Sequence, residues 1–131
     1  MPVLPRARWA FLVAAALLPT ACGQTKPVRF SGSRVLLRLD EYRILPRKVS
    51  IRPGRIKIVA TDTGVLAHNL RVESYTTDRA GSPTVIYGTT KTALPGQSVT
   101  LKVALAPGHY RLLCTLGNHS ELGQVGMLIV Q

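Results

Sequence analysis

Apolar and polar side chains alternate along most of the chain after residue 32, which is the pattern of strands with one buried face. The alternation is clearest over residues 33–42, where Val35, Leu37 and Leu39 are spaced two apart, and over residues 98–105. Turns that contain Gly or Pro separate the apolar runs, and no run has the period of a helix. We therefore expect an all-β sandwich or barrel of about seven to eight short strands.

Shorter apolar runs predict the other strands. Residues 47–64 are expected to form a hairpin, with its turn at Pro53-Gly54 and alternating residues on both sides. The pattern predicts further strands over residues 68–74, 84–88, 109–114 and 125–130. All of them belong to one domain, because a chain of 131 residues is too short for two.

The N-terminal segment, residues 1–22, has the layout of an export signal. Arg6 and Arg8 precede the apolar run 9–18, which is too short to cross a bilayer. The segment ends in Pro-Thr-Ala-Cys, which is similar to the lipobox of bacterial lipoproteins. Cys22 is then the lipid anchor, and ordinary cleavage after the small residues is the alternative.

Two further regions follow this signal. Residues 23–32 are polar, contain Pro and Gly, and are expected to form a flexible tether. Residues 33–131 contain all the predicted strands and are expected to form the folded domain.

The chain is strongly basic, with 17 Lys and Arg residues against 6 Asp and Glu residues and a formal net charge of +11. Such a charge attracts acidic proteins and anionic membrane surfaces. A nucleic-acid partner is disfavoured, because the basic residues are scattered among apolar ones and aromatic residues make up only 5% of the chain. We therefore expect no nucleic-acid binding.

A short stretch near the C-terminus, residues 114–127, gathers several metal donors. His119 follows Cys114 by five residues, and Gln124 follows His119 by five. A thiolate, an imidazole and a weak third donor this close together suit one soft transition-metal ion, with copper as the first candidate. Ligation would also give Cys114 a purpose, since a lone thiol in an exported protein is otherwise open to oxidation. The loop lacks the second imidazole that such a site needs.

His109 is a weak choice for that imidazole. It lies five residues before Cys114 on one predicted strand, so the two side chains would point to opposite faces, roughly 17 Å apart. We expect His109 to be a partly exposed strand residue without a ligand role. The third histidine, His68, stands at the start of another predicted strand.

Two stretches together resemble the type I copper site of the cupredoxin family. In LAHNLRV, residues 66–72, an asparagine directly follows a histidine, as is common in that family, and residues 107–130 are similar to its C-terminal ligand loop with the flanking strands. The spacing Cys-x4-His-x4-Gln has the loop length of rusticyanin- and auracyanin-like members. The resemblance spans residues 33–131. It implies a cupredoxin-like Greek-key β-sandwich that holds one type I copper ion.

The resemblance also implies a role for individual residues. His68, Cys114 and His119 would be the three trigonal copper ligands. Asn69 would tie the His68 loop to the cysteine loop by hydrogen bonds. Two imidazoles and a thiolate suit both Cu(I) and Cu(II), so electron transfer would need little rearrangement.

The axial position departs from the commonest pattern of the family. Gln124 stands where methionine is usual, as in stellacyanin-type sites, and its harder oxygen donor should favour Cu(II) and lower the reduction potential. Met127 is the alternative axial ligand, but its place in an apolar strand favours packing in the core.

The function implied by the resemblance is single-electron transfer by an exported, monomeric copper protein of the periplasm or cell surface. Its partner would be a redox protein with an acidic docking surface, such as a cytochrome or an oxidase domain. Electrons would pass through His119, with Leu116 and Leu122 as an apolar docking patch. Lipid at Cys22 would anchor the protein to the membrane.

Other functions use the same residues differently. The protein could bind and deliver copper without transferring electrons, or it could be a metal-free β-sandwich that serves as an interaction module. Zn(II) also suits the ligands in vitro. We expect no enzymatic activity, because the sequence shows no Ser/His/Asp arrangement, glycine-rich phosphate loop or carboxylate pair.

Overall fold

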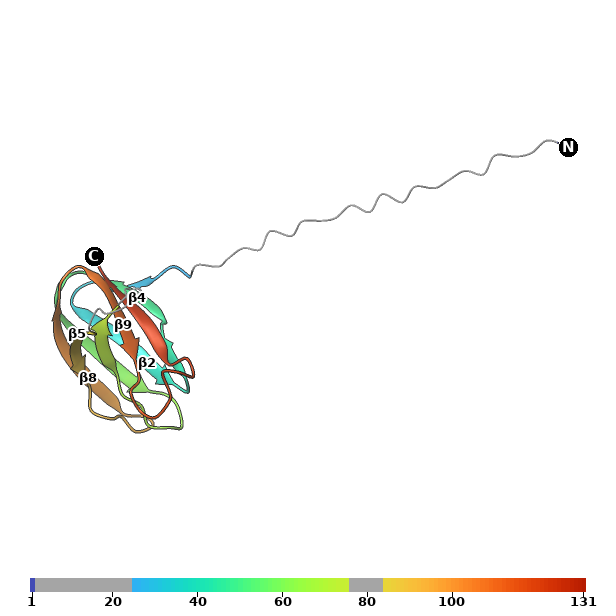
Figure 1. Cartoon of the computed structure of the whole chain (residues 1–131). Helices are drawn as coiled ribbons and strands as arrows, with labels where there is room; N and C mark the ends of the chain where they lie inside the picture. Colours follow the sequence, from blue (N-terminus) through green and yellow to red (C-terminus); the bar gives the residue numbers. More distant parts are fainter. Residues whose placement is uncertain (2–24, 76–83) are drawn as a thin grey trace.

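The structure is a computed structural model that describes Met1 and residues 25–75 and 84–131, and the secondary structure in these ranges is all β (Figure 1). The rest of the predicted export signal, Cys22 included, lies outside the described residues. The described part contains no helix long and apolar enough to cross a membrane. Its ten strands are β1 (Val28–Arg29), β2 (Arg34–Asp40), β3 (Arg43–Leu45), β4 (Lys48–Ile51), β5 (Gly54–Asp62), β6 (Arg71–Ser74), β7 (Ile86–Thr89), β8 (Ser98–Leu105), β9 (Gly108–Leu113) and β10 (Val125–Val130).

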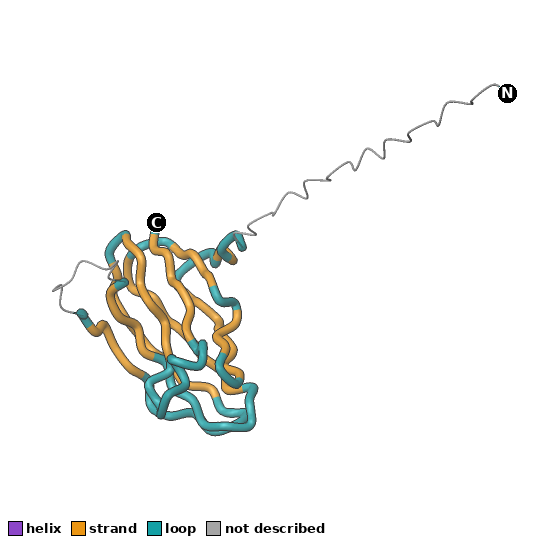
Figure 2. The backbone as a smooth tube through the Cα atoms, turned by 45° about the vertical axis from the view of Figure 1, so that its right-hand side comes forward, coloured by secondary structure: helices purple, strands orange, loops and turns teal. Residues whose placement is uncertain are grey.

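The strands form two sheets that pack as a sandwich. One sheet has six strands in the order β1-β4-β10-β9-β6-β7, and the other has four in the order β3-β2-β5-β8. β4 and β10 run parallel, as do β2 and β5, whereas β9 is antiparallel to both of its neighbours. Long loops gather at the lower end of the domain in Figure 2. The all-β sandwich predicted from the sequence is confirmed.

The core lies between the sheets and uses the predicted alternation. On β2, Val35, Leu37 and Leu39 are buried while the residues between them face solvent. On β5, Ile56 and Ile58 are buried in the same way. The period-two pattern therefore identified the inner faces of these strands correctly, because successive side chains of a strand point to opposite sides.

The hairpin predicted over residues 47–64 is wrong. β4 pairs with β1 and β10 in the six-stranded sheet, whereas β5 pairs with β2 and β8 in the other sheet. The chain crosses from one sheet to the other at Arg52 and Pro53, and Gly54 adopts a φ of 125° that a residue with a side chain rarely tolerates. A strand that turns back and a strand that changes sheets show the same alternation, so the sequence could not separate them.

Part of the predicted tether is folded. β1 pairs in parallel with β4, and Phe30 N donates a hydrogen bond to Ser50 O at 2.8 Å. The Phe30 ring packs against the core. The folded domain thus extends upstream of the predicted boundary at residue 33, and β1 is one reason why there are ten strands rather than seven or eight.

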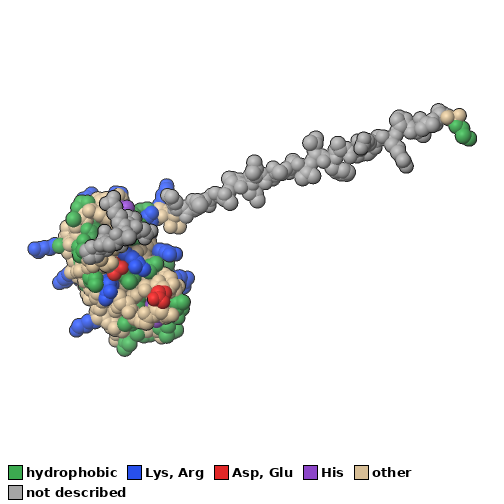
Figure 3. All heavy atoms as spheres, viewed as in Figure 1, with side chains coloured by type: hydrophobic (Ala, Val, Ile, Leu, Met, Phe, Trp, Pro, Cys, Tyr) green, Lys and Arg blue, Asp and Glu red, His purple; other side chains and the backbone are tan. Residues whose placement is uncertain are grey.

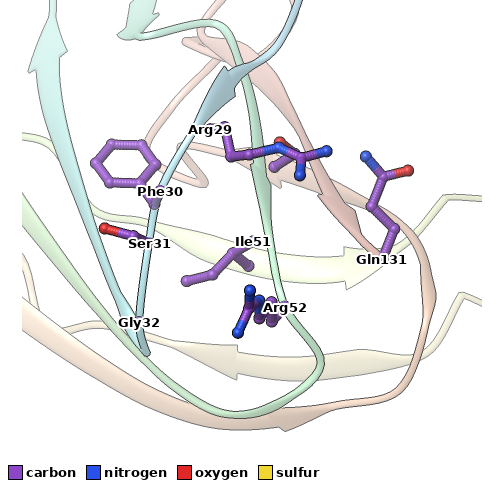
Figure 4. A pocket seen from close by; sticks show the side chains of 8 residues that line it. Arg29, Phe30, Ser31, Gly32, Ile51, Arg52 and Gln131 are labelled. Atoms are coloured by element: carbon purple, nitrogen blue, oxygen red, sulfur yellow. The ribbon is translucent and has the colours of Figure 1, made fainter.

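The two ends of the sandwich differ in character. The end with the C-terminus holds an open pocket, where Arg29 and Arg52 lie near Gln131 (Figure 4). Lys and Arg side chains project from the outline of the domain (Figure 3), as the net charge requires. The opposite end carries the loop between β5 and β6 and the loop between β9 and β10, which contain the predicted metal ligands.

The effect of truncating a side chain on stability should differ between the inner and outer faces of the four-stranded sheet. Ile58→Ala should lower the free energy of unfolding by about 2–5 kcal/mol, because it leaves a cavity between the sheets. Leu36→Ala, on the outer face of β2, removes a side chain that is 50% exposed and should change it by about 0.5 kcal/mol or less. Denaturant unfolding of both variants measures the difference, and equal losses would contradict this assignment of faces.

Candidate metal centre

Two loops at one end of the sandwich bring the predicted ligands together. His68 lies between β5 and β6, and two backbone hydrogen bonds of 3.0 and 2.7 Å fix it against Ala93. Cys114 directly follows β9, and its N–H donates to Gln124 O at 3.2 Å, where β10 is about to begin. His119 lies in the loop between them, and its carbonyl accepts a 3.0 Å hydrogen bond from Gln124 N. Backbone hydrogen bonds therefore hold each ligand position before any metal binds.

The donor atoms of His68, Cys114 and His119 converge. One donor atom from each residue lies within 4.8 Å of the others. Cys114 Sγ is 3.6 Å from His119 Nδ1, and the two imidazole rings are 5.1 Å apart between centroids. His68 and Cys114 are completely buried, whereas His119 is only partly covered. The cluster therefore has an inner imidazole, an inner sulfur and an outer imidazole near the surface.

Several polar atoms in this region are buried without a hydrogen-bond partner. Both ring nitrogens of His68 and the Oε1 atom of Gln124 are in this state. An unsatisfied buried polar group costs about 1–3 kcal/mol, so native proteins rarely retain one without a purpose. A neutral imidazole has a free lone pair on one ring nitrogen and a proton on the other, so a bound cation would satisfy one nitrogen of His68. The Gln124 oxygen also has lone pairs to offer a cation.

The orientation of the Gln124 amide follows from its one hydrogen bond. Its nitrogen donates to Asp40 O at 2.8 Å, and a backbone carbonyl can only accept. The NH2 group must therefore face Asp40, which leaves the amide oxygen as the free donor. Gln124 is completely buried, so this oxygen is also shielded from water.

Asn69 connects the two ligand loops. Its side-chain nitrogen donates to Thr115 Oγ1 at 2.7 Å, and its oxygen accepts from Thr115 N at 2.8 Å. Thr115 is the residue directly after Cys114, so these bonds fix the sulfur relative to His68. This is the tie between loops that the cupredoxin resemblance implied for Asn69.

The turn between β2 and β3 was missed by the sequence analysis, although it touches three residues of the region. Asp40 O accepts from Gln124, Glu41 Oε1 lies 3.6 Å from His68 Nε2, and the Tyr42 ring meets the His119 ring edge-on at a centroid distance of 5.6 Å. These contacts join residues far apart in sequence, so no local pattern reports them. The sequence signal that could have pointed to this turn is the pair of adjacent carboxylates Asp40 and Glu41, which stand at a strand end in a basic chain.

Glu41 is ionised across the neutral range. Its Oε1 accepts hydrogen bonds from Leu66 N at 2.9 Å and Val65 N at 2.6 Å. These two donors lower the pKa of Glu41 to about 2, because they stabilise the carboxylate form. A fixed negative charge therefore stands beside the buried His68 ring.

His109 and Met127, the other possible ligands considered from the sequence, lie away from the cluster. His109 is exposed on β9, opposite Ile129, as expected. Met127 is partly buried and lines a surface pocket with Lys48 and Arg111, so the expectation that it packs in the core is wrong. It lies on the outer face of β10, because Leu128 beside it points inward to the core.

The donor set fits a copper ion. Two imidazoles and a thiol on fixed loops match the ligands that copper takes in electron-transfer sites. The unpartnered atoms of His68 and Gln124 are the structural observation behind this fit. The pocket of Figure 4 lies at the other end of the strands and contributes nothing to the cluster.

Comparison with known proteins places the fold. No protein-family model and no curated protein matches the chain. Among solved structures, reduced auracyanin from the photosynthetic bacterium Roseiflexus castenholzii aligns with a TM-score of 0.66 and 24% identity, over 78% of this chain and 99% of that one. Auracyanin B aligns at 0.63 and 18% identity, over 81% and 91%. Auracyanin A, a "blue" copper protein from the green thermophilic photosynthetic bacterium Chloroflexus aurantiacus, aligns at 0.60 and 18%, over 75% and 99%.

Removal of the Asn69 side chain should loosen the link between the ligand loops. Asn69→Ala deletes two hydrogen bonds and leaves Thr115 N unpaired, so the free energy of unfolding of the metal-free protein should fall by about 1–3 kcal/mol. Asn118→Ala removes an exposed amide in the same end of the domain and should change it by about 0.5 kcal/mol or less. Denaturant unfolding compares the two variants, and similar values would contradict the role of Asn69.

The similarity to the auracyanins covers nearly the whole of each of those proteins, and at this level of identity it establishes the fold. The chain is a cupredoxin-like β-sandwich that aligns with auracyanins, one of which is described as a "blue" copper protein.

Proposed function

We propose that this protein binds one copper ion at type I geometry and transfers single electrons. His68, Cys114 and His119 would hold the ion, and Gln124 Oε1 would be the fourth, weaker donor. The observation that carries the proposal is the convergence of three donor atoms within 4.8 Å on loops already fixed by hydrogen bonds. When bound, copper supplies a one-electron couple that no side chain of the chain provides.

The protein would keep its ligands in nearly one arrangement in both oxidation states. His68 is held by Ala93, and the Asn69–Thr115 pair holds the cysteine loop. Gln124 is bonded to both Asp40 and His119. Because these contacts do not involve the metal, a change of oxidation state need not move them, and electron transfer is fast when little rearrangement is required.

His119 is the ligand through which electrons would enter and leave. It is the partly covered member of the cluster, whereas His68 and Cys114 are sealed from solvent. The exposed Tyr42 ring packs edge-on against the His119 ring. Leu122, on the same loop as His119, is also exposed. An apolar surface beside the outer imidazole would let a partner dock without a tightly held water layer between the two centres.

The proposed partner is a redox protein with an acidic surface, such as a cytochrome or an oxidase domain. The net charge of +11 supports it, because oppositely charged surfaces accelerate encounter. The segment 1–22 supports export, with lipid at Cys22 as the proposed anchor. Both features would keep a monomeric carrier close to membrane-bound partners.

Loss of the thiol should abolish the proposed site. The wild type titrated with Cu(II) should turn intensely blue, because the Cys114 sulfur donates charge to the metal. Cys114→Ser should bind weakly and without that colour, while His109→Ala, which changes a histidine on an exposed strand face, should match the wild type. A colourless wild-type complex would overturn the proposal, and rapid release of copper to a chelator would favour copper delivery instead.

Replacement of the amide donor should shift the reduction potential. Gln124→Met exchanges an oxygen donor for a softer thioether, which favours Cu(I), so the potential measured by voltammetry should rise. Gln131→Met, at the far end of β10, is the matched control and should leave it unchanged. A Gln124→Met variant with the wild-type potential would show that Oε1 does not reach the metal.

A further inference from the structure

Glu41 is the charged group that faces the inner imidazole of the cluster. Its Oε1 atom lies 3.6 Å from His68 Nε2, and His68 has no exposed surface. At this separation the contact is electrostatic rather than a hydrogen bond. Neither ring nitrogen of His68 has another partner among the described residues, so the carboxylate is the neighbour that can distinguish them.

The carboxylate is held in place by the same loop that carries His68. Val65 N and Leu66 N both donate to Oε1, at 2.6 and 2.9 Å. Gly64 makes room for it, because a Cβ atom there would lie only 2.2 Å from Oε1. Three consecutive positions of the β5–β6 loop therefore form a seat for one side chain of the β2–β3 turn.

The position of Glu41 has a consequence for the protonation of the ring. A neutral imidazole carries one proton, on either nitrogen, and a negative charge beside Nε2 favours the form with the proton there. Nδ1 then keeps its lone pair. Glu41 lies next to Nε2, whereas Nδ1 has no partner among the described residues, so Nδ1 is the nitrogen left free for a metal at the cluster of His68, Cys114 and His119.

We propose that Glu41 is a positioning residue that orients His68 and fixes its proton on Nε2, so that Nδ1 is ready to bind the metal and is made more basic. This inference rests on the proposed copper function. Histidine ligands generally need a group that binds their second nitrogen, and a carboxylate raises ligand basicity more than a neutral acceptor does. The added negative charge favours Cu(II) over Cu(I), so Glu41 lowers the reduction potential together with the oxygen donor of Gln124.

A purely structural role for Glu41 makes a different prediction. Glu41→Gln retains an oxygen that can accept from Val65 N and Leu66 N, so a side chain that only supports the loop would be replaced without effect. A side chain that acts through its charge would not. Gly64→Ala displaces the carboxylate without changing the charge of the chain, so it tests whether the position of that charge matters.

The first measurement is the tautomer of His68 in the metal-free protein, read from long-range nitrogen–proton correlations by NMR. The wild type should carry its proton on Nε2. In Glu41→Gln and Gly64→Ala the form protonated on Nδ1 should become populated. Glu121→Gln, an exposed carboxylate in the β9–β10 loop, is the matched control and should behave as the wild type.

The second measurement is copper binding. Competition with a chelator should show the Cu(II) affinity of Glu41→Gln and Gly64→Ala reduced roughly 10- to 100-fold, the usual effect of losing a group that supports a ligand. The reduction potential of Glu41→Gln should rise. If both variants keep the wild-type tautomer, affinity and potential, the inference is overturned even though copper binds. If the wild type binds no copper, the proposed function fails, while the tautomer result still decides the role of Glu41.

Discussion

The buried imidazole of His68 is the constraint that the rest of the metal-binding end must satisfy. It sits in the sandwich with no exposed surface and no hydrogen-bond partner on either nitrogen. Gln124 Oε1 is also buried without a hydrogen-bond partner. Unsatisfied buried groups oppose folding, so the loops that hold them must be fixed by other interactions. Backbone bonds to Ala93, the Asn69–Thr115 pair and the amide of Gln124 supply that fixation.

The site depends on both sheets of the sandwich. Cys114 and Gln124 stand at the ends of β9 and β10 in the six-stranded sheet. Asp40 ends β2 in the four-stranded sheet, and Glu41 and Tyr42 follow it. The core between the sheets sets the distance between these two groups, because side chains of both inner faces pack there. A change in sheet packing would therefore move the turn relative to the ligands. The packing of the core between the sheets therefore determines where the donor atoms lie.

The sequence predicted the parts of this arrangement that are local or have a fixed spacing. Alternation identified the inner faces of β2 and β5, and the spacing of Cys114, His119 and Gln124 indicated a metal loop. It could not predict that β4 and β5 belong to different sheets, because the alternation of side chains does not show which strand pairs with which. It also missed Glu41 and Tyr42, whose contacts with His68 and His119 depend on how the sheets pack. Met127 was misplaced because an apolar strand has an outer face as well as an inner one.

The fold is proposed to hold one copper ion in nearly the same surroundings in both oxidation states. X-ray absorption at the copper edge, recorded on the oxidised and the reduced protein, tests it most directly. One sulfur and two nitrogen neighbours are expected in each state, with distances that barely change on reduction. A spectrum without a sulfur neighbour, or a change in the number of strong ligands between the two states, would contradict it.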